Sequence, residues 1–288
     1  MKVLVTGFNG QLGFDVVKEL NSRSIECKGV DIADFDITDK DQTLAFLRDY
    51  APDAVVHCAA YTAVDKAEDD EEPCRKVNVG GSENLALGCI ELGPKMLYVS
   101  TDYVYGGLGD TAFETTDKTD PKSVYGKTKL EGENAVIRNV DKYFIVRTSW
   151  VFGINGNNFV KTMLRLGAER DVLTVVDDQI GSPTYTPDLA RLICDLIMTD
   201  KYGIYHGTNE NYCSWAEFAR AIMTLGGRKA EIKPIPSSEY PAKAQRPLNS
   251  RLSKECLDRI GIKRLPTWQN ALERYFEELK ISSDKGKI

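Results

Sequence analysis

The chain has 288 residues, 43 of them acidic and 37 basic, which gives a formal net charge of -6 at pH 7. This acidic balance, without a basic stretch interleaved with aromatic residues, argues against a nucleic-acid partner. No run approaches the roughly 20 consecutive apolar residues needed to cross a bilayer. The start of the chain, Met1–Thr6, reads as a strand with no cleavage pattern after it. We therefore expect a cytoplasmic protein that has no membrane partner.

The seven cysteines are widely scattered and contain no Cys-x-x-Cys pair, so we expect reduced thiols. The two histidines, His57 and His206, have no metal-ligand spacing around them. A requirement for Mg²⁺ stays open, but no motif supports it, because Asp15 and the few carboxylates near it do not establish a site. The sequence therefore predicts no metal ligands.

Short apolar runs predict five strands that are covered on both faces, at residues 2–6, 26–30, 54–58, 96–100 and 143–148. Between them, helical patterns cover residues 11–21, 39–49, 74–92 and 123–138. This alternation predicts βαβ units with a parallel sheet and right-handed crossovers. The expected fold class is α/β, a Rossmann-type doubly wound parallel sheet with a smaller C-terminal substrate-binding lobe.

Beyond Trp150 predicted strands and helices no longer alternate regularly. Helices are expected at residues 158–170, 187–198, 214–225, 253–260 and 268–279, and a proline-rich surface segment at 234–247. We expect residues 1–149 to form a dinucleotide-binding domain to which 172–207 is added. Residues 150–171 and 208–279 would form the substrate-binding lobe, and 280–288 a frayed tail.

A glycine-rich turn joins the first strand to the first helix, with the spacing Gly-x-x-Gly-x-x-Gly. Glycine allows the tight turn and lets the backbone approach a pyrophosphate, which then sits at the helix N-terminus. An ordinary glycine turn would give the same pattern in isolation, but its position between a strand and a helix favours a dinucleotide site. The residues of this turn predicted to bind the cofactor are Gly7, Asn9, Gly10, Gln11, Leu12 and Gly13.

Asp31 ends the second strand, where a carboxylate can accept hydrogen bonds from an adenosine ribose. It would repel the 2′-phosphate of NADP, whereas the nearby Lys28 would partly offset that repulsion. The pattern therefore leaves NAD and NADP open. Asp36, followed by Ile37, fits either a place beside the adenine or a loop carboxylate in water.

Thr101 follows the fourth strand, and Tyr125 and Lys129 open the next helix. The carboxyl ends of parallel strands share one edge, so these side chains should meet the glycine turn. Tyr125 and Lys129 are four residues apart and share a helix face, so we expect the ammonium to lower the pKa of the phenol. Thr101 would hold a substrate oxygen while Tyr125 passes a proton, and Lys129 would also hold the nicotinamide ribose. A Tyr-x-x-x-Lys pair alone is more often structural, but here it joins a dinucleotide motif.

The glycine turn and the Tyr-x-x-x-Lys pair resemble those of the extended short-chain dehydrogenase/reductases. Longer blocks narrow the resemblance to the dTDP-4-dehydrorhamnose reductase family, over about residues 1–279. The matching blocks are residues 57–67, 100–105, 124–129, 147–151 and 246–252.

The resemblance implies reduction of the C4 ketone of dTDP-4-dehydro-L-rhamnose by NADPH or NADH, with the nicotinamide released after each turnover. It also suggests a homodimer. Thr101, Tyr125 and Lys129 match the family's catalytic residues, and Tyr125 and Lys129 also its cofactor site. Further cofactor contacts implied in this way are Asp31, Asp36, Ile37, Ala59, Ala60, Tyr61 and Asn78. The implied substrate contacts are Thr101, Asp102, Tyr103, Trp150, Asn158, Arg246, Asn249 and Arg251.

Physical reasons support part of the substrate set. Arg246 and Arg251 could neutralise a diphosphate with forked hydrogen bonds, and Trp150 and Tyr103 offer aromatic faces. A solvated arginine or a core tryptophan would produce the same pattern.

Two other functions stay open. A sugar-nucleotide epimerase would keep NAD tightly bound, whereas a non-catalytic regulatory subunit, similar to that of methionine adenosyltransferase, would bind a dinucleotide without turnover. Thr101 is followed by Asp102 and Tyr103 with no adjacent Asp-Glu pair, which disfavours a dehydratase.

Overall fold

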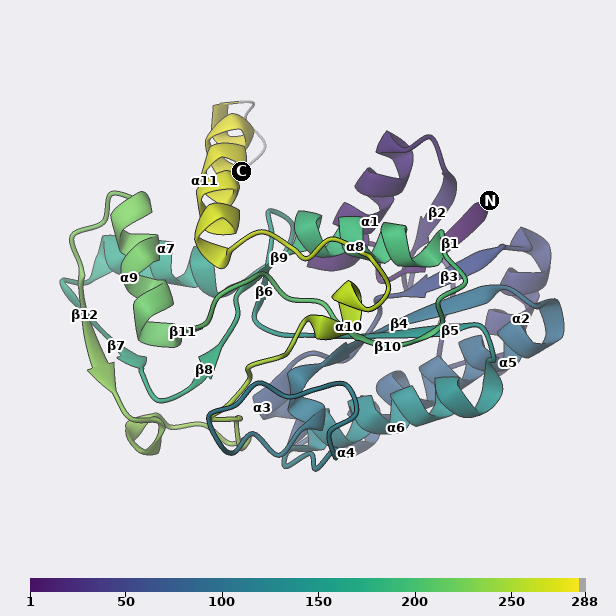
Figure 1. Cartoon of the computed structure of the whole chain (residues 1–288), viewed down its shortest axis with the longest axis horizontal. Coiled ribbons are helices and arrows are strands. Elements are labelled where there is room, and N and C mark those ends of the chain that lie inside the picture. Colours follow the sequence, from purple (N-terminus) through teal and green to yellow (C-terminus); the bar gives the residue numbers. More distant parts are fainter. Residues whose placement is uncertain (285–288) are drawn as a thin grey trace.

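A six-stranded parallel sheet forms the centre of the computed structural model, which describes residues 1–284 (Figure 1). The strand order is β10-β5-β4-β3-β1-β2. This arrangement confirms the predicted Rossmann-type α/β fold class. The strands are β1 (Lys2–Thr6), β2 (Glu26–Val30), β3 (Ala54–His57), β4 (Lys95–Thr101), β5 (Tyr143–Thr148) and β10 (Gly203–His206).

Five of these strands match the predicted runs within one residue at either end. β1, β3, β4 and β5 are short apolar stretches inside the sheet, whereas β2 forms an edge and exposes Glu26 and Lys28. The sixth strand, β10, was not predicted. It pairs in parallel with β5 from Gly203 to His206, and its sequence, which begins with glycine and ends with histidine, is not a continuous apolar run.

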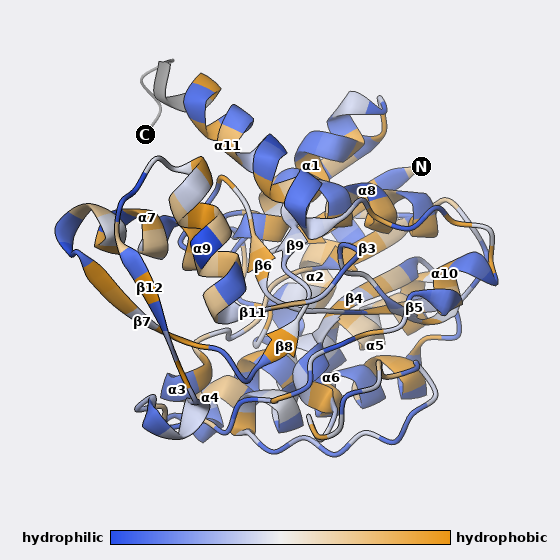
Figure 2. Ribbon diagram, turned by 60° about the vertical axis from the view of Figure 1, so that its left-hand side comes forward, coloured by the Kyte–Doolittle hydropathy of each residue, from blue (hydrophilic) through white to orange (hydrophobic). Residues whose placement is uncertain are grey.

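Helices cover both faces of the sheet. Alternate residues of β1 point to opposite sides, so Val3 and Val5 pack with α1 (Gln11–Ser22) and α8 (Thr186–Ile197), whereas Leu4 packs on the other side. That other face is covered by α2 (Lys40–Tyr50), α5 (Ser82–Leu92) and α6 (Val124–Asn139). Figure 2 shows the alternation of hydrophobic and hydrophilic residues along α1 and α8.

The predicted helix over 74–92 forms, but it begins three residues earlier and contains a π-helical segment. It runs from α4 (Glu71–Arg75) through the π-helical segment Lys76–Gly81 into α5, and a short α3 (Val64–Ala67) precedes it. The weak helix formers Gly80 and Gly81 lie in the π-helical segment, and the Ser82 hydroxyl donates to the Asn78 carbonyl at 2.7 Å.

The order in which strands are added to the sheet reverses next to β1. The chain runs from β1 to β2 on one side and then crosses to β3 on the other, so the strand order reverses between β1 and β3. In open α/β sheets, ligands bind outside the carboxyl ends of the strands at this point. The fold therefore places a crevice above the turn that follows β1.

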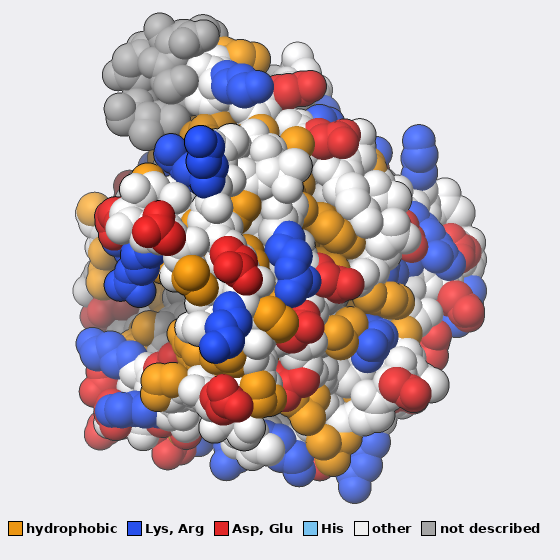
Figure 3. Space-filling model, turned by 90° about the vertical axis from the view of Figure 1, so that its left-hand side faces the viewer, with side chains coloured by type: hydrophobic (Ala, Val, Ile, Leu, Met, Phe, Trp, Pro, Cys, Tyr) orange, Lys and Arg blue, Asp and Glu red, His pale blue; other side chains and the backbone are white. Residues whose placement is uncertain are grey.

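A second, smaller core lies beside the sheet, on the left of Figure 1. Here α7 (Phe159–Glu169), α9 (Trp215–Leu225) and α11 (Trp268–Asp284) pack with β7 (Val172–Val176), which pairs in parallel with β12 (Glu231–Ile235). A capping box between Ser214 and Glu217 starts α9. Figure 3 shows basic and acidic side chains interspersed on the face of this lobe.

Short elements connect the two cores. β6 (Val151–Phe152) pairs with β9 (Thr184–Tyr185), β8 (Ile180–Gly181) pairs with β11 (Cys213–Ser214), and α10 (Glu255–Asp258) packs near β10. Of the range 172–207, the structure brings α8 and β10 to the sheet, while β7 and Tyr185 pack in the second core.

The C-terminal part departs from expectation in two places. β12 extends to Ile235 and a 3-10 turn covers Ser237–Glu239, so regular structure occupies the start of the predicted proline-rich segment. Helix α11 continues to Asp284, past the predicted end at 279. The rest of the expected frayed tail, 285–288, lies outside the described residues. Within residues 1–284, no helix combines the length and apolar character needed to cross a membrane.

Candidate functional site

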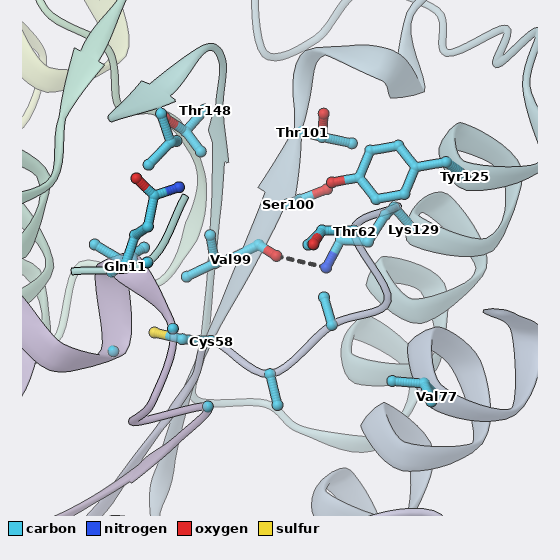
Figure 4. A pocket seen from close by; sticks show the side chains of 18 of the residues that line it. Gln11, Cys58, Thr62, Val77, Val99, Ser100, Thr101, Tyr125, Lys129 and Thr148 are labelled. Carbon is cyan, nitrogen blue, oxygen red and sulfur yellow. Dashed lines mark hydrogen bonds between the residues drawn. The ribbon is translucent and has the colours of Figure 1, made fainter. Parts of the chain in front are cut away.

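A cavity of about 990 Å³ opens at the carboxyl edge of the sheet, between the sheet and the second core (Figure 4). Its walls come from the turn after β1, the ends of β2 to β5, the start of α6 and the first residue of α9. Predicted site residues lining it are Gly7, Gly10, Gln11, Leu12, Gly13, Asp31, Asp36, Ile37, Ala59, Ala60, Thr101, Asp102, Tyr103, Tyr125, Lys129, Trp150, Asn158 and Arg246.

The turn after β1 requires glycine. Gly7 has a φ of +72°, and a Cβ there would lie 2.6 Å from the Ala59 nitrogen. A Cβ at Gly13 would lie 2.2 Å from the Gly7 carbonyl oxygen. Gly10 caps α1 without a side chain, so no side chain occupies the first N–H groups of the helix. The turn therefore offers backbone donors and the positive end of a helix to an anion.

The carboxylates after β2 are held by backbone groups. Asp31 accepts hydrogen bonds from the Asn9 N–H at 3.0 Å and the Ile32 N–H at 2.9 Å. Asp36 accepts from the Thr38 N–H at 2.9 Å. Both acidic side chains line the cavity, which is compatible with either of the two places expected for Asp36.

Thr101, Asp102 and Tyr125 meet at the end of β4. The Thr101 hydroxyl donates to Asp102 Oδ1 at 3.0 Å and accepts from the Tyr103 N–H at 3.2 Å. The Tyr103 ring lies edge-on to the Tyr125 ring, with centroids 5.5 Å apart. Asp102 is buried, it also accepts from the Ser250 hydroxyl, and burial raises the pKa of its carboxyl to about 6.

The expectation that Lys129 lowers the pKa of Tyr125 is wrong for this structure. Burial, and after it the charge of Asp102, raise the pKa of Tyr125 above its ordinary value, and a hydrogen-bonding contribution from Thr101 only partly opposes them. The physical reason is that both groups are buried in the same wall, where the neutral phenol is favoured.

Lys129 is engaged elsewhere. Its ammonium donates to the Val99 carbonyl at 2.7 Å, as the dashed line in Figure 4 shows, and lies 4.0 Å from the centroid of the Tyr98 ring. Burial lowers the pKa of Lys129 to about 7, and the charge of Glu133 partly opposes that shift. An ammonium has three donors, so two remain for other partners.

An aromatic cluster lines the cavity on the side of the second core. Trp150 has a φ of +49°, uncommon for a bulky residue, and its ring stacks on Trp215 with centroids 3.7 Å apart. Phe159 packs against Trp215 at 4.6 Å. Sequence reasoning missed Trp215 and Phe159 as lining residues. The signal in the sequence was their position, since each is the second residue of a predicted helix and so lies next to the loop before that helix.

Two more predicted substrate residues line the cavity but already have protein partners. The Arg246 guanidinium forms a fork with the Asp65 carboxylate, with N···O distances of 2.9 and 2.6 Å. Asn158 caps α7 by accepting from the Lys161 N–H at 3.0 Å, and its amide donates to Gln11 Oε1 at 3.0 Å.

Three residues predicted at the cofactor site stay outside the cavity walls. Asn9 supports Asp31 through its backbone N–H. Asn78 is buried, and its side-chain oxygen accepts from the Tyr61 N–H at 2.8 Å. Its amide also donates to the Thr128 hydroxyl at 3.1 Å. Asn78 thus joins the loop after β3 to α6.

Asn249 and Arg251 also stay outside the cavity walls. Asn249 is buried and donates to the Thr111 carbonyl at 2.7 Å. Arg251 donates to Asn249 Oδ1 at 3.0 Å and lies over the Tyr212 ring. Both side chains brace the loops around 108–111 and 249–251.

Two buried hydroxyls in the cavity wall, those of Ser100 and Thr148, have no hydrogen-bond partner within residues 1–284. Figure 4 places them at the ends of neighbouring strands, β4 and β5. Buried hydroxyls normally have hydrogen bonds, so this pair suits a polar ligand. Over residues 1–284, no group of three or more His, Cys, Asp or Glu side chains is arranged to hold a metal ion.

Comparisons with known proteins identify the family of the chain. The family described as the RmlD substrate binding domain matches residues 1–281. The chain is 39% identical to the spore coat polysaccharide biosynthesis protein SpsK of Bacillus subtilis, over 98% of this chain and 99% of that protein.

Relatives named as reductases are equally similar. The dTDP-4-dehydrorhamnose reductase of Aggregatibacter actinomycetemcomitans is 40% identical, over 94% of this chain and 97% of that protein. The crystal structure of the Bacillus anthracis dTDP-4-dehydrorhamnose reductase in complex with NADP is 42% identical, covers 96% of this chain and 99% of that one, and superposes with a TM-score of 0.94. By both its sequence and its fold, the chain belongs to the RmlD family of dTDP-4-dehydrorhamnose reductases.

Proposed function

We propose that this chain uses NADPH or NADH to reduce the C4 ketone of dTDP-4-dehydro-L-rhamnose, giving dTDP-L-rhamnose. The observation that carries the proposal is that Thr101, Tyr125 and Lys129 line the same cavity as the glycine turn. The names of the relatives suggest the substrate, and the cavity has room for a dinucleotide beside a sugar ring.

The residues present fit a nicotinamide dinucleotide. Gly7 to Gly13 and the N-terminus of α1 would hold the pyrophosphate, and Asp31 the adenosine ribose. The unpaired hydroxyls of Ser100 and Thr148 would receive polar groups at the nicotinamide end. When bound, the nicotinamide supplies a hydride to the carbonyl carbon.

Tyr125 would supply the proton. Its raised pKa keeps the phenol protonated at neutral pH, the form that a ketone reduction needs before the carbonyl oxygen gains negative charge. The Thr101 hydroxyl, fixed by Asp102 and the Tyr103 N–H, would orient that oxygen next to the phenol.

Lys129 would stabilise the phenolate left after proton transfer. Its ammonium keeps one bond to the Val99 carbonyl, which fixes its position, and has two donors for a ribose hydroxyl and the phenol. The ammonium would therefore act on the pKa of Tyr125 once a ligand fills the cavity, whereas burial dominates in the structure described here.

The other end of the cavity would bind the sugar nucleotide. The stacked Trp150 and Trp215 rings offer an apolar face to a deoxysugar or base, and Tyr103 lies beside Tyr125. Arg246 would meet the diphosphate. We propose that Asn249 and Arg251 position the segment that carries Arg246, since neither lines the cavity.

We also propose that the two cores bind different ligands. The sheet would hold the dinucleotide, and the second core would supply the side chains that contact the sugar nucleotide. The resemblance that suggests the reaction further suggests a cytoplasmic enzyme and a homodimer. Sedimentation at several protein concentrations tests the dimer.

The decisive assay follows the absorbance of NADH and NADPH with purified protein and dTDP-4-dehydro-L-rhamnose. We expect oxidation with this ketone and none with dTDP-glucose, which has no C4 ketone to reduce. Stoichiometric NAD retained through purification, with no net oxidation, would favour the epimerase instead. Association with a synthetase without reductase activity would favour the regulatory subunit.

A further inference from the structure

We propose that Ser250 is a positioning residue for the reduction, which holds the Asp102 carboxylate and through it the Thr101 hydroxyl in the reactive wall. This inference deepens the proposed function and rests on it, because it requires Thr101 and Tyr125 to act on a ketone. Ser250 does not line the cavity, so it would act through Asp102 and not on a ligand.

Hydrogen bonds lead from Ser250 to the reactive wall. The Ser250 hydroxyl donates to Asp102 Oδ2, and the Thr101 hydroxyl donates to Asp102 Oδ1 at 3.0 Å. The Thr101 oxygen also accepts from the Tyr103 N–H at 3.2 Å. Figure 4 shows Thr101 beside the Tyr125 ring. The orientation of the Asp102 carboxylate therefore decides how the Thr101 hydroxyl is presented next to the phenol.

Asp102 depends on both of its hydroxyl partners. The exposed fractions of Ser250, Asp102 and Thr101 are 2%, 3% and 5%, so water has little access to these bonds. Burial raises the pKa of the Asp102 carboxyl to about 6, and the hydrogen bonds from Ser250 and Thr101 oppose that shift. A buried carboxylate oxygen that loses its donor is costly, so without Ser250 the carboxylate would turn toward another donor. That rotation would disturb its bond to Thr101.

The backbone around Ser250 is itself held in place. The Ile180 N–H donates to the Leu248 carbonyl at 2.9 Å, and the Ser250 N–H donates to the Ile180 carbonyl at 2.8 Å. The Asn249 N–H donates to the Gly107 carbonyl at 2.9 Å. These bonds join the segment that carries Ser250 both to β8 and to the loop that follows β4.

Close packing restricts the Ser250 side chain further. A Cβ at Gly181 would lie 3.1 Å from the Ser250 Cβ and 2.8 Å from Trp150 Cε2, both shorter than ordinary contact. The backbone of β8 therefore lies directly against Ser250. A hydroxyl in such packing has little freedom to leave Asp102.

A serine that only satisfies a buried carboxylate would make the same bond, and its loss would then affect stability alone. The place of Asp102 argues for more, because it directly follows Thr101 at the end of β4 and lines the cavity. Misplacing a reacting group by about 1 Å can slow a reaction about 10²-fold. We therefore expect Ser250 to affect the rate more strongly than binding.

Steady-state kinetics of the full-length protein with dTDP-4-dehydro-L-rhamnose test this split. Ser250→Ala should lower kcat at least about tenfold and change the KM for the sugar nucleotide less than about twofold. Its dinucleotide affinity, measured by nicotinamide fluorescence, should stay unchanged. Ser253→Ala is the matched control and should keep full turnover, because Ser253 lies outside the cavity wall and its hydroxyl contacts the Glu255 N–H at 3.4 Å.

Two further variants show whether the effect passes through Asp102. Ser250→Cys keeps a weak donor at the same position and should restore part of the kcat that Ser250→Ala loses. In an Asp102→Ala background, Ser250→Ala should lower kcat less than about twofold further, because groups that act through one another are not additive.

An unchanged kcat in Ser250→Ala would overturn the inference while leaving the proposed reaction intact, as would full additivity of the Ser250 and Asp102 substitutions. An unaltered protein that binds a dinucleotide but does not reduce the ketone would overturn both the proposed function and this inference.

Discussion

The two ends of the cavity are built by different means. The end proposed to hold the dinucleotide is made of backbone: a glycine turn, a helix N-terminus without a capping side chain, and carboxylates held by N–H groups. The end proposed to hold the sugar nucleotide is made of side chains from distant parts of the chain: Trp150, Trp215 and Arg246. The first end is therefore rigid and local, and the second depends on how the two cores pack together.

This contrast predicts how each end responds to mutation. Changes at the dinucleotide end should alter backbone geometry and so affect stability and cofactor binding together. Changes at the sugar end should alter substrate recognition while leaving the cofactor affinity unaffected.

The largest expected effect lies where the two ends meet. Tyr125→Phe removes the proton donor, so turnover should fall about 10²- to 10⁴-fold while dinucleotide binding stays. Steady-state kinetics under saturating ligands measure this effect. Tyr143→Phe, which removes a phenol at the opposite edge of the sheet, should keep full turnover, and an unimpaired Tyr125→Phe enzyme would refute the proposed chemistry.

The next effect tests the backbone character of the dinucleotide end. Gly13→Ala would place a methyl group 2.2 Å from the Gly7 carbonyl oxygen, so the turn must shift. We expect a stability loss of about 1–3 kcal/mol and at least about tenfold weaker dinucleotide binding. Chemical denaturation and fluorescence titration measure the two effects. Gly80→Ala, where nothing lies within 4 Å of the added methyl group, is the matched control.

A smaller, more selective effect belongs to the side-chain end. Trp215→Ala removes the ring that stacks on Trp150, and the KM for the sugar nucleotide should rise about tenfold. The dissociation constant for the dinucleotide should not change, because Trp215 belongs to the second core, whereas the glycine turn belongs to the sheet. A parallel loss of dinucleotide binding would mean that the two ends are not independent.

The smallest effect is a pH dependence set by Lys129. Burial lowers its pKa to about 7, and the proposed role needs the ammonium, which is lost as pH rises through that value. Between pH 6.5 and 7.5, kcat/KM should fall about threefold. His57 and His206 contribute nothing here, because burial lowers both pKa values to about 3.

A variant separates this titration from others. Lys129→Arg keeps a positive charge throughout the range, so the decline near pH 7 should disappear in whatever activity remains. A flat profile in the unaltered enzyme would show that Lys129 does not control the rate.

The same contrast explains what the sequence could predict. Four of the five predicted strands were recognisable because each is mostly an apolar run, and β2 because it stands between the first two helical patterns. The glycine turn was recognisable because its spacing imposes a backbone shape. Both features depend on residues that are close in the chain.

The remaining parts depend on long-range packing. Trp215 reaches the cavity only because α9 packs in the second core, and Arg246 only because Asp65, 181 residues earlier, holds it. The pKa of Tyr125 was misjudged because helix spacing reports proximity to Lys129 but not burial. The sequence also placed Lys28 near Asp31, but the Lys28 ammonium lies over the Phe46 ring of α2, 4.9 Å from its centroid, a contact that the local pattern does not reveal.

The Arg246 guanidinium already has an anionic partner, the Asp65 carboxylate, before any ligand binds. A diphosphate that binds Arg246 would have to compete with this carboxylate, so its net binding free energy would be smaller than that of an unpaired arginine. The same competition would weaken the binding of the product. Weaker product binding favours its release, which an enzyme needs at the end of every turnover.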